Sequence, residues 1–266
     1  DVIFPVVHGP FGEDGSVQGL VKLLDLPFVG PGVLGSAVAM DKDAMKRLFS
    51  FAGIPTARWQ TIPAHRRHEL DVAAIVTELG LPLYVKPANM GSSVGVSRVT
   101  QPEELAAALD EAFLYDSKVL IEENIKGREI ECAVLGNENP IASGVGEIIP
   151  RDGFYSYEAK YIDESGAALE IPARLSADEV QAVQAMSIRA YEALLLEGMS
   201  RVDMFLLESG ELYVNEVNTI PGFTGISMYP KLWEAAGLPL PRLLDRLIEL
   251  AIERYQRVRA LKTDAD

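Results

Sequence analysis

The chain has 266 residues, of which 48% are hydrophobic, and a formal net charge of −15 at pH 7. A chain of this length can bury a large core, as one domain or as a few smaller ones. The negative charge argues against nucleic acid or an anionic membrane as a partner, and no apolar run approaches the roughly 20 residues of a membrane-spanning helix. One cysteine, Cys132, excludes a disulfide framework within the chain, and its alternating surroundings predict a buried structural thiol.

The sequence of the N-terminal region predicts one and a half βα units. We expect a buried strand at 1–7, a glycine-rich loop at 8–15, a helix at 16–24 and a short strand at 27–30. Because the first strand has no preceding partner in the sequence, we expect a further segment ahead of it. Ligands of open α/β sheets bind at the loops after the strands, where His8 lies, although a lone histidine is more often structural.

A lysine inside an apolar strand marks the next region. We expect a helix capped by Asp41, and then a strand, a glycine- and serine-rich loop and a second strand within 81–97. No helix follows those glycines, so the loop is neither a Walker A motif nor a Rossmann fingerprint. Small residues with free N–H groups can still fold over phosphates, and Lys86 needs an anionic partner if it is buried. The alternative is a flexible hairpin loop with Lys86 at its rim.

The remaining elements follow from capping and periodicity. Capping boxes are expected at 100–103 and 176–179. The expected strands lie at 57–62, 118–122 and within 128–149, and the expected helices at 71–79, 102–114, 178–196, 229–236 and 241–260. The carboxylates that end strand 118–122 are compatible with solvated ends or with acceptors for a nucleotide, and composition does not choose between them.

Two apolar runs, 202–207 and 212–217, flank Ser209 and Gly210. A two-residue link that ends in glycine is typical of a β-hairpin with a tight turn. We therefore expect these runs to pair as neighbouring antiparallel strands.

This hairpin brings acidic side chains together. With the turn centred on Ser209 and Gly210, Asp203 faces Glu216, Arg201 faces Asn218, and all four side chains share one face. Facing carboxylates repel unless a cation lies between them, and an all-oxygen set suits Mg²⁺. The alternative is a solvated acidic face. We favour the metal site.

Together these motifs resemble those of the ATP-grasp superfamily, and within it those of D-alanine–D-alanine ligases. The matching stretches are 8–15 (HGPFGEDG), 40–42 (MDK), 86–95 (KPANMGSSVG), 157–161 (YEAKY), 201–203 (RVD) and 216–222 (EVNTIPG). They span nearly the whole chain in the order of the family, which is far more specific than any one motif. Pro10 stands where we expect a second glycine.

The resemblance implies an α/β fold of the α+β ATP-grasp type. Residues 1–40 would be the remnant of an N-terminal parallel α/β domain, most of which is absent from this chain. Residues 41–127 and 128–266 would form two α+β subdomains that clasp ATP. The implied activity is the ATP-dependent joining of two D-alanines through an acyl phosphate, for peptidoglycan synthesis in the cytoplasm, by a homodimer that uses two Mg²⁺ ions, which Mn²⁺ can replace.

The resemblance also implies the site residues. Those that would bind ATP are Lys42, Lys86, Ser92, Ser93, Glu122, Glu123, Ile125, Glu129, Lys160 and Asn215. Those that would bind metal are Asp203, Glu216 and Asn218. Those that would act in catalysis are Arg201, Gly222, Ser92, Tyr161 and Lys160. Those near the D-alanines would be His8, Arg201, Gly222, Ser227 and Met228.

Two other functions remain open at this point. One is another ATP-grasp ligase, such as an ester-forming D-alanine–D-lactate ligase. The other is a nucleotide-binding module without turnover, which the intact metal and oxyanion residues argue against. We also predict that the loop 91–95 and the segment 155–161 are mobile without ligand, because neither has enough apolar residues to hold it in place.

Overall fold

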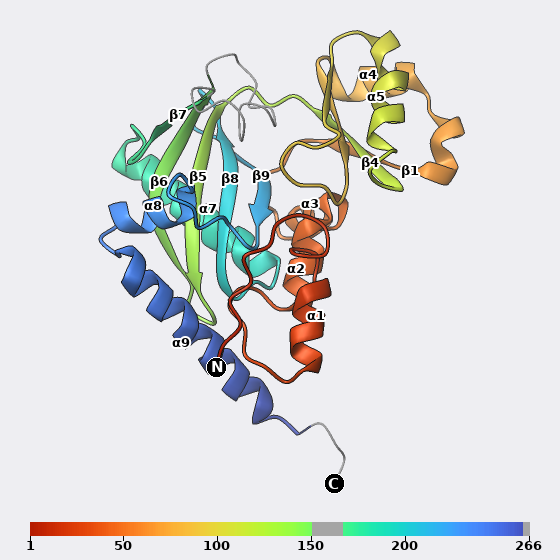
Figure 1. Cartoon of the computed structure of the whole chain (residues 1–266). Helices are drawn as coiled ribbons and strands as arrows, with labels where there is room; N and C mark the ends of the chain where they lie inside the picture. The colour runs from red at the N-terminus through yellow and green to blue at the C-terminus, as the bar shows by residue number, and fades with distance from the viewer. Residues whose placement is uncertain (151–166, 263–266) are drawn as a thin grey trace.

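The computed structural model describes residues 1–150 and 167–262, and it contains two antiparallel sheets (Figure 1). The smaller sheet has the order β1-β4-β2-β3, formed by Trp59–Pro63, Lys118–Glu123, Leu83–Pro87 and Ser97–Val99. The larger has the order β7-β6-β5-β8-β9, formed by Ala167–Glu170, Ile141–Pro150, Arg128–Gly136, Gly198–Leu206 and Leu212–Asn218. The chain passes from one sheet to the other through residues 124–127.

The smaller sheet is covered by α4 (Val72–Leu79) and α5 (Leu105–Ala112). Alternate residues of β2 and β4 are buried against these helices, among them Val85 and Ile121, which are both fully buried. The intervening β2 residues are partly exposed, which is the alternation expected of a sheet that packs on one face. Lys86 is one of these intervening residues, so it points away from this core.

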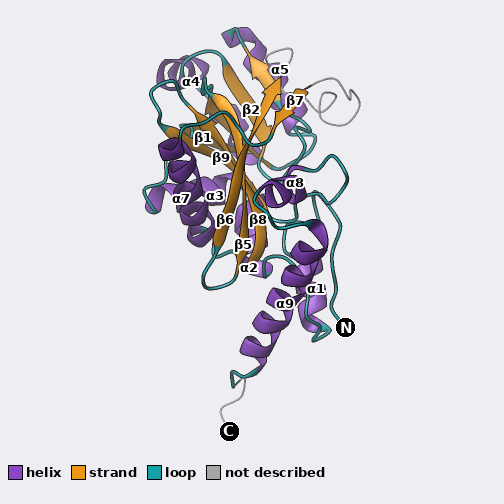
Figure 2. Ribbon diagram, turned by 90° about the vertical axis from the view of Figure 1, so that its left-hand side faces the viewer, coloured by secondary structure: helices purple, strands orange, loops and turns teal. Residues whose placement is uncertain are grey.

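The larger sheet is covered on both faces, by α7 (Ala177–Ala193) on one side and by α8 (Met228–Ala235) and α9 (Leu240–Arg259) on the other (Figure 2). Along β5, Cys132 packs into the α7 core, whereas Ala133 and Leu135 pack against α8 and α9. Glu129 and Glu131 share the face of Ala133 but lie nearer the start of the strand. The sheet face that is apolar beneath α8 and α9 thus continues as an acidic surface.

The predicted strand at 1–7 is wrong. Within this stretch only Ile3 forms a bridge, a parallel one with Phe28, through bonds from Ile3 N to Pro27 O and from Val29 N to Ile3 O, each 2.9 Å. Proline has no backbone N–H, so Pro5 and Pro27 cannot donate to a longer ladder. The short strand at 27–30 is reduced to the same bridge.

The helices largely follow the prediction. Asp41 caps α3 (Lys42–Phe51) by accepting a bond from Ala44 N at 3.0 Å, and α1 spans Ser16–Leu23. The helix α2 (Val33–Met40) was not predicted, because its small apolar residues carry almost no polar face. The helix α3 contributes Met45 and Phe49 to the core of the larger sheet.

One of the two capping boxes is displaced by a residue. The box at 176–179 is present as predicted, but the first one joins Gln101 to Glu104 and opens a short 3-10 helix, Pro102–Glu104, ahead of α5. Proline favours the first helical position, so the residue before Pro102 becomes the cap. None of the helices within the described part of the chain is both long and apolar enough to span a membrane. Cys132 is fully buried, as expected, and burial raises the pKa of its thiol.

Candidate active site

The turn of the β8–β9 hairpin is longer than predicted. Three residues, 208–210, separate Leu207 from Glu211, whose backbones are joined by a bond from Leu207 N to Glu211 O at 2.9 Å. Gly210 has a φ of 86°, the left-handed conformation that such three-residue loops require at their last position. Next to this turn, Met204 pairs with Val214, which is one residue away from the expected register.

A bulge in β9 restores the expected register where the site begins. Between Met204 and Asp203 the pairing shifts by one residue, leaving Asn215 without a partner. Asp203 consequently pairs with Glu216, and Arg201 with Asn218, as predicted. The bulge also places Asn215 and Glu216, which are consecutive residues, toward the same cavities.

The row of acids across the sheet contains one residue that the sequence analysis did not assign. Glu131 of β5 pairs with Asp203 of β8, which pairs with Glu216 of β9, so three carboxylates form a row across three adjacent strands. The sequence signal was available, because Glu131 follows the predicted ATP-binding residue Glu129 by two positions in an alternating strand and therefore shares its face.

Arg201 lies within this row and compensates two of its charges. Its Nε and Nη2 donate to the two oxygens of Asp203, each at 2.7 Å, and Nε also lies 3.0 Å from Glu131 Oε2. Burial alone would lower the pKa of the guanidinium, but Asp203 and Glu131 hold it well above its usual value. Arg201 is therefore a fixed cation whose direction is set by two carboxylates.

The donor set fits a divalent cation that prefers oxygen. Asp203, Glu216 and Asn218 supply carboxylate and amide oxygens from two neighbouring strands, the ligand types that suit Mg²⁺. In the present arrangement Asn218 Nδ2 donates to Asp203 Oδ2 at 2.9 Å, so its amide would have to turn to offer oxygen. Within residues 1–150 and 167–262, no three His, Cys, Asp or Glu side chains lie close enough to hold an ion, so phosphate or water oxygens would have to complete the shell.

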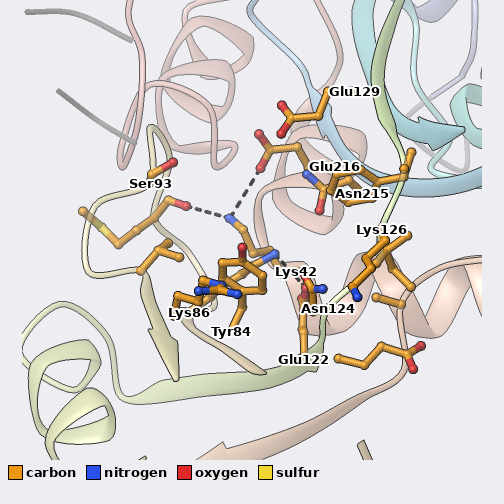
Figure 3. Close-up of a pocket in the computed structure, with 18 residues that line it drawn as sticks. Lys42, Tyr84, Lys86, Ser93, Glu122, Asn124, Lys126, Glu129, Asn215 and Glu216 are labelled. Atoms are coloured by element: carbon orange, nitrogen blue, oxygen red, sulfur yellow. Dashed lines mark hydrogen bonds and ion pairs between the residues drawn. The ribbon is translucent and has the colours of Figure 1, made fainter. Parts of the chain in front are cut away.

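A cleft of about 630 Å³ lies between the two sheets (Figure 3). Lys42 enters it from the start of α3, with Nζ donating to Met90 O at 2.6 Å and lying 4.0 Å from Glu216 Oε2. Glu123, Ile125 and the other residues of the connection between the sheets line its edge. The cleft thus joins a lysine, the backbone carbonyl of Met90 just before the loop 91–95, and one carboxylate of the acidic row.

Lys86 has the anionic partner that the sequence predicted. Its Nζ lies 2.7 Å from Glu122 Oε2, and Nζ of Lys46 lies 3.4 Å from Glu122 Oε1. Burial by itself raises the pKa of Glu122, but the two lysines more than offset this and lower it to about 2. Burial lowers the pKa of Lys46, whereas the charge of Glu122 raises that of Lys86 in spite of burial.

A second cavity, of about 320 Å³, lies over the acidic row. Gly222 lies in its wall, where a Cβ would come within 2.7 Å of Ser227 Oγ and 3.8 Å of His8 Nε2, so a larger residue would collide there. Glu13, which the sequence analysis did not assign, accepts from Gly9 N at 2.7 Å and from Ile220 N at 3.4 Å. It thereby joins the His8 loop to the segment after β9, and burial raises its pKa.

The two cavities share four lining residues: Glu129, Phe205, Asn215 and Glu216. Ser93 lines the first cavity, Ser92 the second, and every predicted site residue that the structure describes lines one or both. Lys160 and Tyr161, with the rest of 155–161, lie outside the described residues. The sequence motifs therefore converge on one continuous region.

Comparison with known proteins gives a consistent result. The family model described as "D-ala D-ala ligase C-terminus" matches residues 48–249, and that described as "D-ala D-ala ligase N-terminus" matches residues 1–31. The D-alanine–D-alanine ligase of Shouchella clausii is 59% identical over 99% of this chain and 72% of its own length. D-alanine–D-alanine ligase A of Escherichia coli K12 is 54% identical over 99% of this chain and 72% of its own length.

The chain belongs to the D-alanine–D-alanine ligase family. Among solved structures it is similar to the Coxiella burnetii D-alanine–D-alanine ligase, with a TM-score of 0.87 and 44% identity over 98% of this chain and 70% of that one. It is also similar to the VanG D-Ala:D-Ser ligase of Enterococcus faecalis, with a TM-score of 0.87 and 43% identity over 94% of this chain and 73% of that one. The fold is accordingly the ATP-grasp fold, as the motifs predicted.

Within this family fold, three charged residues of the site were missed by the sequence analysis. Glu13 lies inside the motif 8–15, in which only His8 was predicted to belong to the site. Glu131 lies in the alternating strand predicted around Cys132. Lys46 is four residues after Lys42 on α3, and therefore on the same face of the helix, which is the signal that could have found it.

Proposed function

We propose that the chain is a D-alanine–D-alanine ligase, which uses ATP to join two D-alanines through an acyl phosphate. The observation that carries this proposal is the junction at Glu216. This carboxylate lines both the cleft that contains Lys42 and the cavity that contains Arg201 and Gly222. A phosphoryl donor in the first cavity and a carboxylate acceptor in the second would meet there.

The cleft between the sheets has the groups that an adenine nucleotide needs. Lys42 and Lys86 would hold its phosphates, and the loop 91–95 would close over them through Ser92 and Ser93. Each carboxylate oxygen has more than one acceptor site, so Glu122 can still accept from the adenine amino group while its lysines remain bound. Glu123, Ile125, Asn215 and Lys160 would complete the site, and Glu129 would accept from the ribose.

The first step transfers the γ-phosphoryl group to the carboxylate of one D-alanine, breaking the bond between the γ-phosphorus and the β–γ bridging oxygen. A pair of Mg²⁺ ions held by Asp203, Glu216 and Asn218, with Mn²⁺ as a substitute, would offset phosphate charge when bound. Lys42 and Lys86 supply fixed positive charge for the same phosphates. The loop 91–95 shields the acyl phosphate from water.

The second step forms the peptide bond. The amine of the second D-alanine, after losing a proton, attacks the acyl carbon, and phosphate leaves once the tetrahedral centre collapses. Arg201 and the N–H of Gly222 would bind the developing oxyanion, which is the group that most needs stabilisation in acyl transfer. His8, Ser227 and Met228 would contact the D-alanines, and Tyr161 with Ser92 would shape the side on which the amine enters.

The biological setting follows from the same proposal. The dipeptide would serve peptidoglycan synthesis, and hence cell shape, in the cytoplasm where ATP is abundant. We propose a homodimer as the working form, with residues 1–40, 41–127 and 128–266 as its three structural units. The boundary at 127 is supported by the connection 124–127 between the two sheets.

The experiment is an assay of phosphate release and product mass with ATP and Mg²⁺. D-alanine alone should release phosphate with equimolar formation of D-alanyl-D-alanine, and L-alanine should not. D-Lactate or D-serine added with D-alanine tests the other ligase activities. Nucleotide binding without phosphate release under every condition would contradict the proposal and favour a module without turnover.

A further inference from the structure

Glu131 is a buried carboxylate in the site to which the proposed reaction gives no role. It is 4% exposed, it lies on β5 rather than on the β8–β9 hairpin, and its Oε2 is 3.0 Å from Arg201 Nε. A buried charge is costly unless it is paired, so its partners indicate what it does. One of them is the guanidinium proposed to bind the oxyanion.

Glu131 does not extend the metal site. It occupies the same row as Asp203 and Glu216, but within the described residues the three acids are not close enough to hold one ion together, and Glu131 lies 3.0 Å from the Arg201 guanidinium. Glu131 lines the second cavity but is only 4% exposed, so little of its side chain is open to a substrate there. Its contact with Arg201, at 3.0 Å, links it to a residue of the proposed reaction.

The position of Arg201 depends on two carboxylates, of which one has a second task. Asp203 accepts two bonds from Arg201, each at 2.7 Å, and it is also a proposed metal ligand. When a carboxylate oxygen coordinates a cation, the hydrogen bond that the same oxygen accepts from a guanidinium becomes weaker. Once Asp203 is engaged in this way, Glu131 is the anionic partner that still holds Nε of Arg201.

We propose that Glu131 is a positioning residue that keeps the Arg201 guanidinium directed toward the reacting carbonyl while Asp203 serves the metal. This role rests on the proposed ligase function. The bonds of Arg201 within the described part of the chain use Nε and Nη2, so the interaction with Glu131 leaves Nη1 for the oxyanion. Loss of the Glu131 charge should therefore lower the rate of the reaction rather than the affinity for nucleotide.

The first test compares steady-state kinetics of Glu131→Gln, Glu131→Asp and Glu147→Gln. Glu147 is a matched control, because it is 7% exposed, lies in the same sheet, and accepts from Arg128 Nε at 2.8 Å and Nη2 at 2.6 Å outside both cavities. We expect Glu131→Gln to lower kcat by about 10- to 100-fold with KM for ATP within about threefold of wild type. The kcat of Glu131→Asp should lie between those of wild type and Glu131→Gln, and Glu147→Gln should keep the wild-type kcat.

The second test observes Arg201 without turnover. In ¹⁵N spectra of arginine side chains, the Arg201 Nε–H signal, assigned with Arg201→Lys, should shift and exchange faster with solvent in Glu131→Gln, and more so when ADP and Mg²⁺ are added. Glu147→Gln should leave it unchanged. An unchanged kcat and an unchanged Arg201 signal in a folded Glu131→Gln variant would overturn the role of Glu131. Absence of dipeptide synthesis by wild type would instead overturn the ligase function on which it rests.

Discussion

Glu122 shows how one buried residue can link stability to the site. It is 2% exposed, and it lies between two lysines that come from α3 and from β2. Removing one partner from such a buried set leaves charges uncompensated, which typically costs about 3–5 kcal/mol. The same residues therefore hold α3 to the smaller sheet and preorganise the nucleotide cleft.

We predict that Glu122→Gln lowers the free energy of unfolding by about 3–5 kcal/mol at pH 7, because Lys46 and Lys86 lose their shared anion. The folded pKa of Glu122, about 2, lies below its usual value of 4.5, so its contribution is complete above about pH 4.5 and is lost as the pH falls toward 2. The deficit of the variant should shrink over that range. This deficit in the free energy of unfolding is measured by urea unfolding of both proteins at several pH values.

Glu123→Gln is the control for this prediction. Glu123 precedes the same connection, but its partner Arg58 is largely exposed, so its loss should cost much less than the loss of Glu122. A deficit for Glu122→Gln that stays constant from pH 7 to pH 3 would show that the pKa of Glu122 is not depressed in the folded protein.

The residue scale also shows what sequence can and cannot predict. The position of Lys86 within an apolar strand was enough to predict that it needs an anionic partner if it is buried. Spacing placed Lys46 on the helix face of Lys42, but a lysine on a helix is compatible with solvent, and only the packing of α3 against the smaller sheet shows that it is buried. Alternation likewise placed Glu131 on the face of Glu129, but it does not show that Arg201 lies against it.

At the scale of elements, the β8–β9 hairpin determines the register of the site. Its loop has one residue more than the sequence suggested, and β9 has one extra residue at the bulge, so the two differences cancel at Asp203 and Glu216. The facing pairs were predicted correctly although the turn was not. A bulge without glycine or proline leaves no local signal, which is why the sequence could not reveal it.

The turn itself can be tested by opposite glycine substitutions. Gly210→Ala should lower the free energy of unfolding by about 1 kcal/mol, because alanine is strained at a φ of 86° although nothing lies within 4 Å of its Cβ. Gly19→Ala, inside α1 with equally open space, should raise it by about 0.5–1 kcal/mol. Equal effects of the two changes on the urea midpoint would contradict the left-handed assignment of Gly210.

At the scale of the whole molecule, the site lies where two separately packed sheets meet. Each sheet has its own apolar core, and the loop 91–95, which belongs to the smaller sheet, reaches the cavity over the larger one. Gly95 holds the base of this loop, with a φ of 69° and with Tyr115 and Pro87 within 2.8 Å of where a Cβ would be. The sequence predicted most strands of both sheets, but not β7, and it predicted a strand at 1–7 where the structure has a single bridge.

We predict that amide exchange in 91–95 slows on addition of ADP and Mg²⁺, because the loop closes over the phosphates. Gly95→Ala should prevent correct seating of the loop and raise KM for ATP by about tenfold or more. Gly80→Ala, which shares a positive φ but has open space around its Cβ, is the control for strain alone. Exchange that is identical with and without nucleotide would count against a closing loop.

The most direct test of the account is Glu216→Gln, because Glu216 joins the two cavities and keeps its volume in this change. We expect D-alanyl-D-alanine formation to fall by about 100-fold or more in saturating Mg²⁺, with cooperative unfolding retained and ADP still bound. Product is quantified by mass spectrometry against wild type in the same buffer. A Glu216→Gln variant that makes the dipeptide at the wild-type rate would contradict the claim that the two cavities form one active site through this carboxylate.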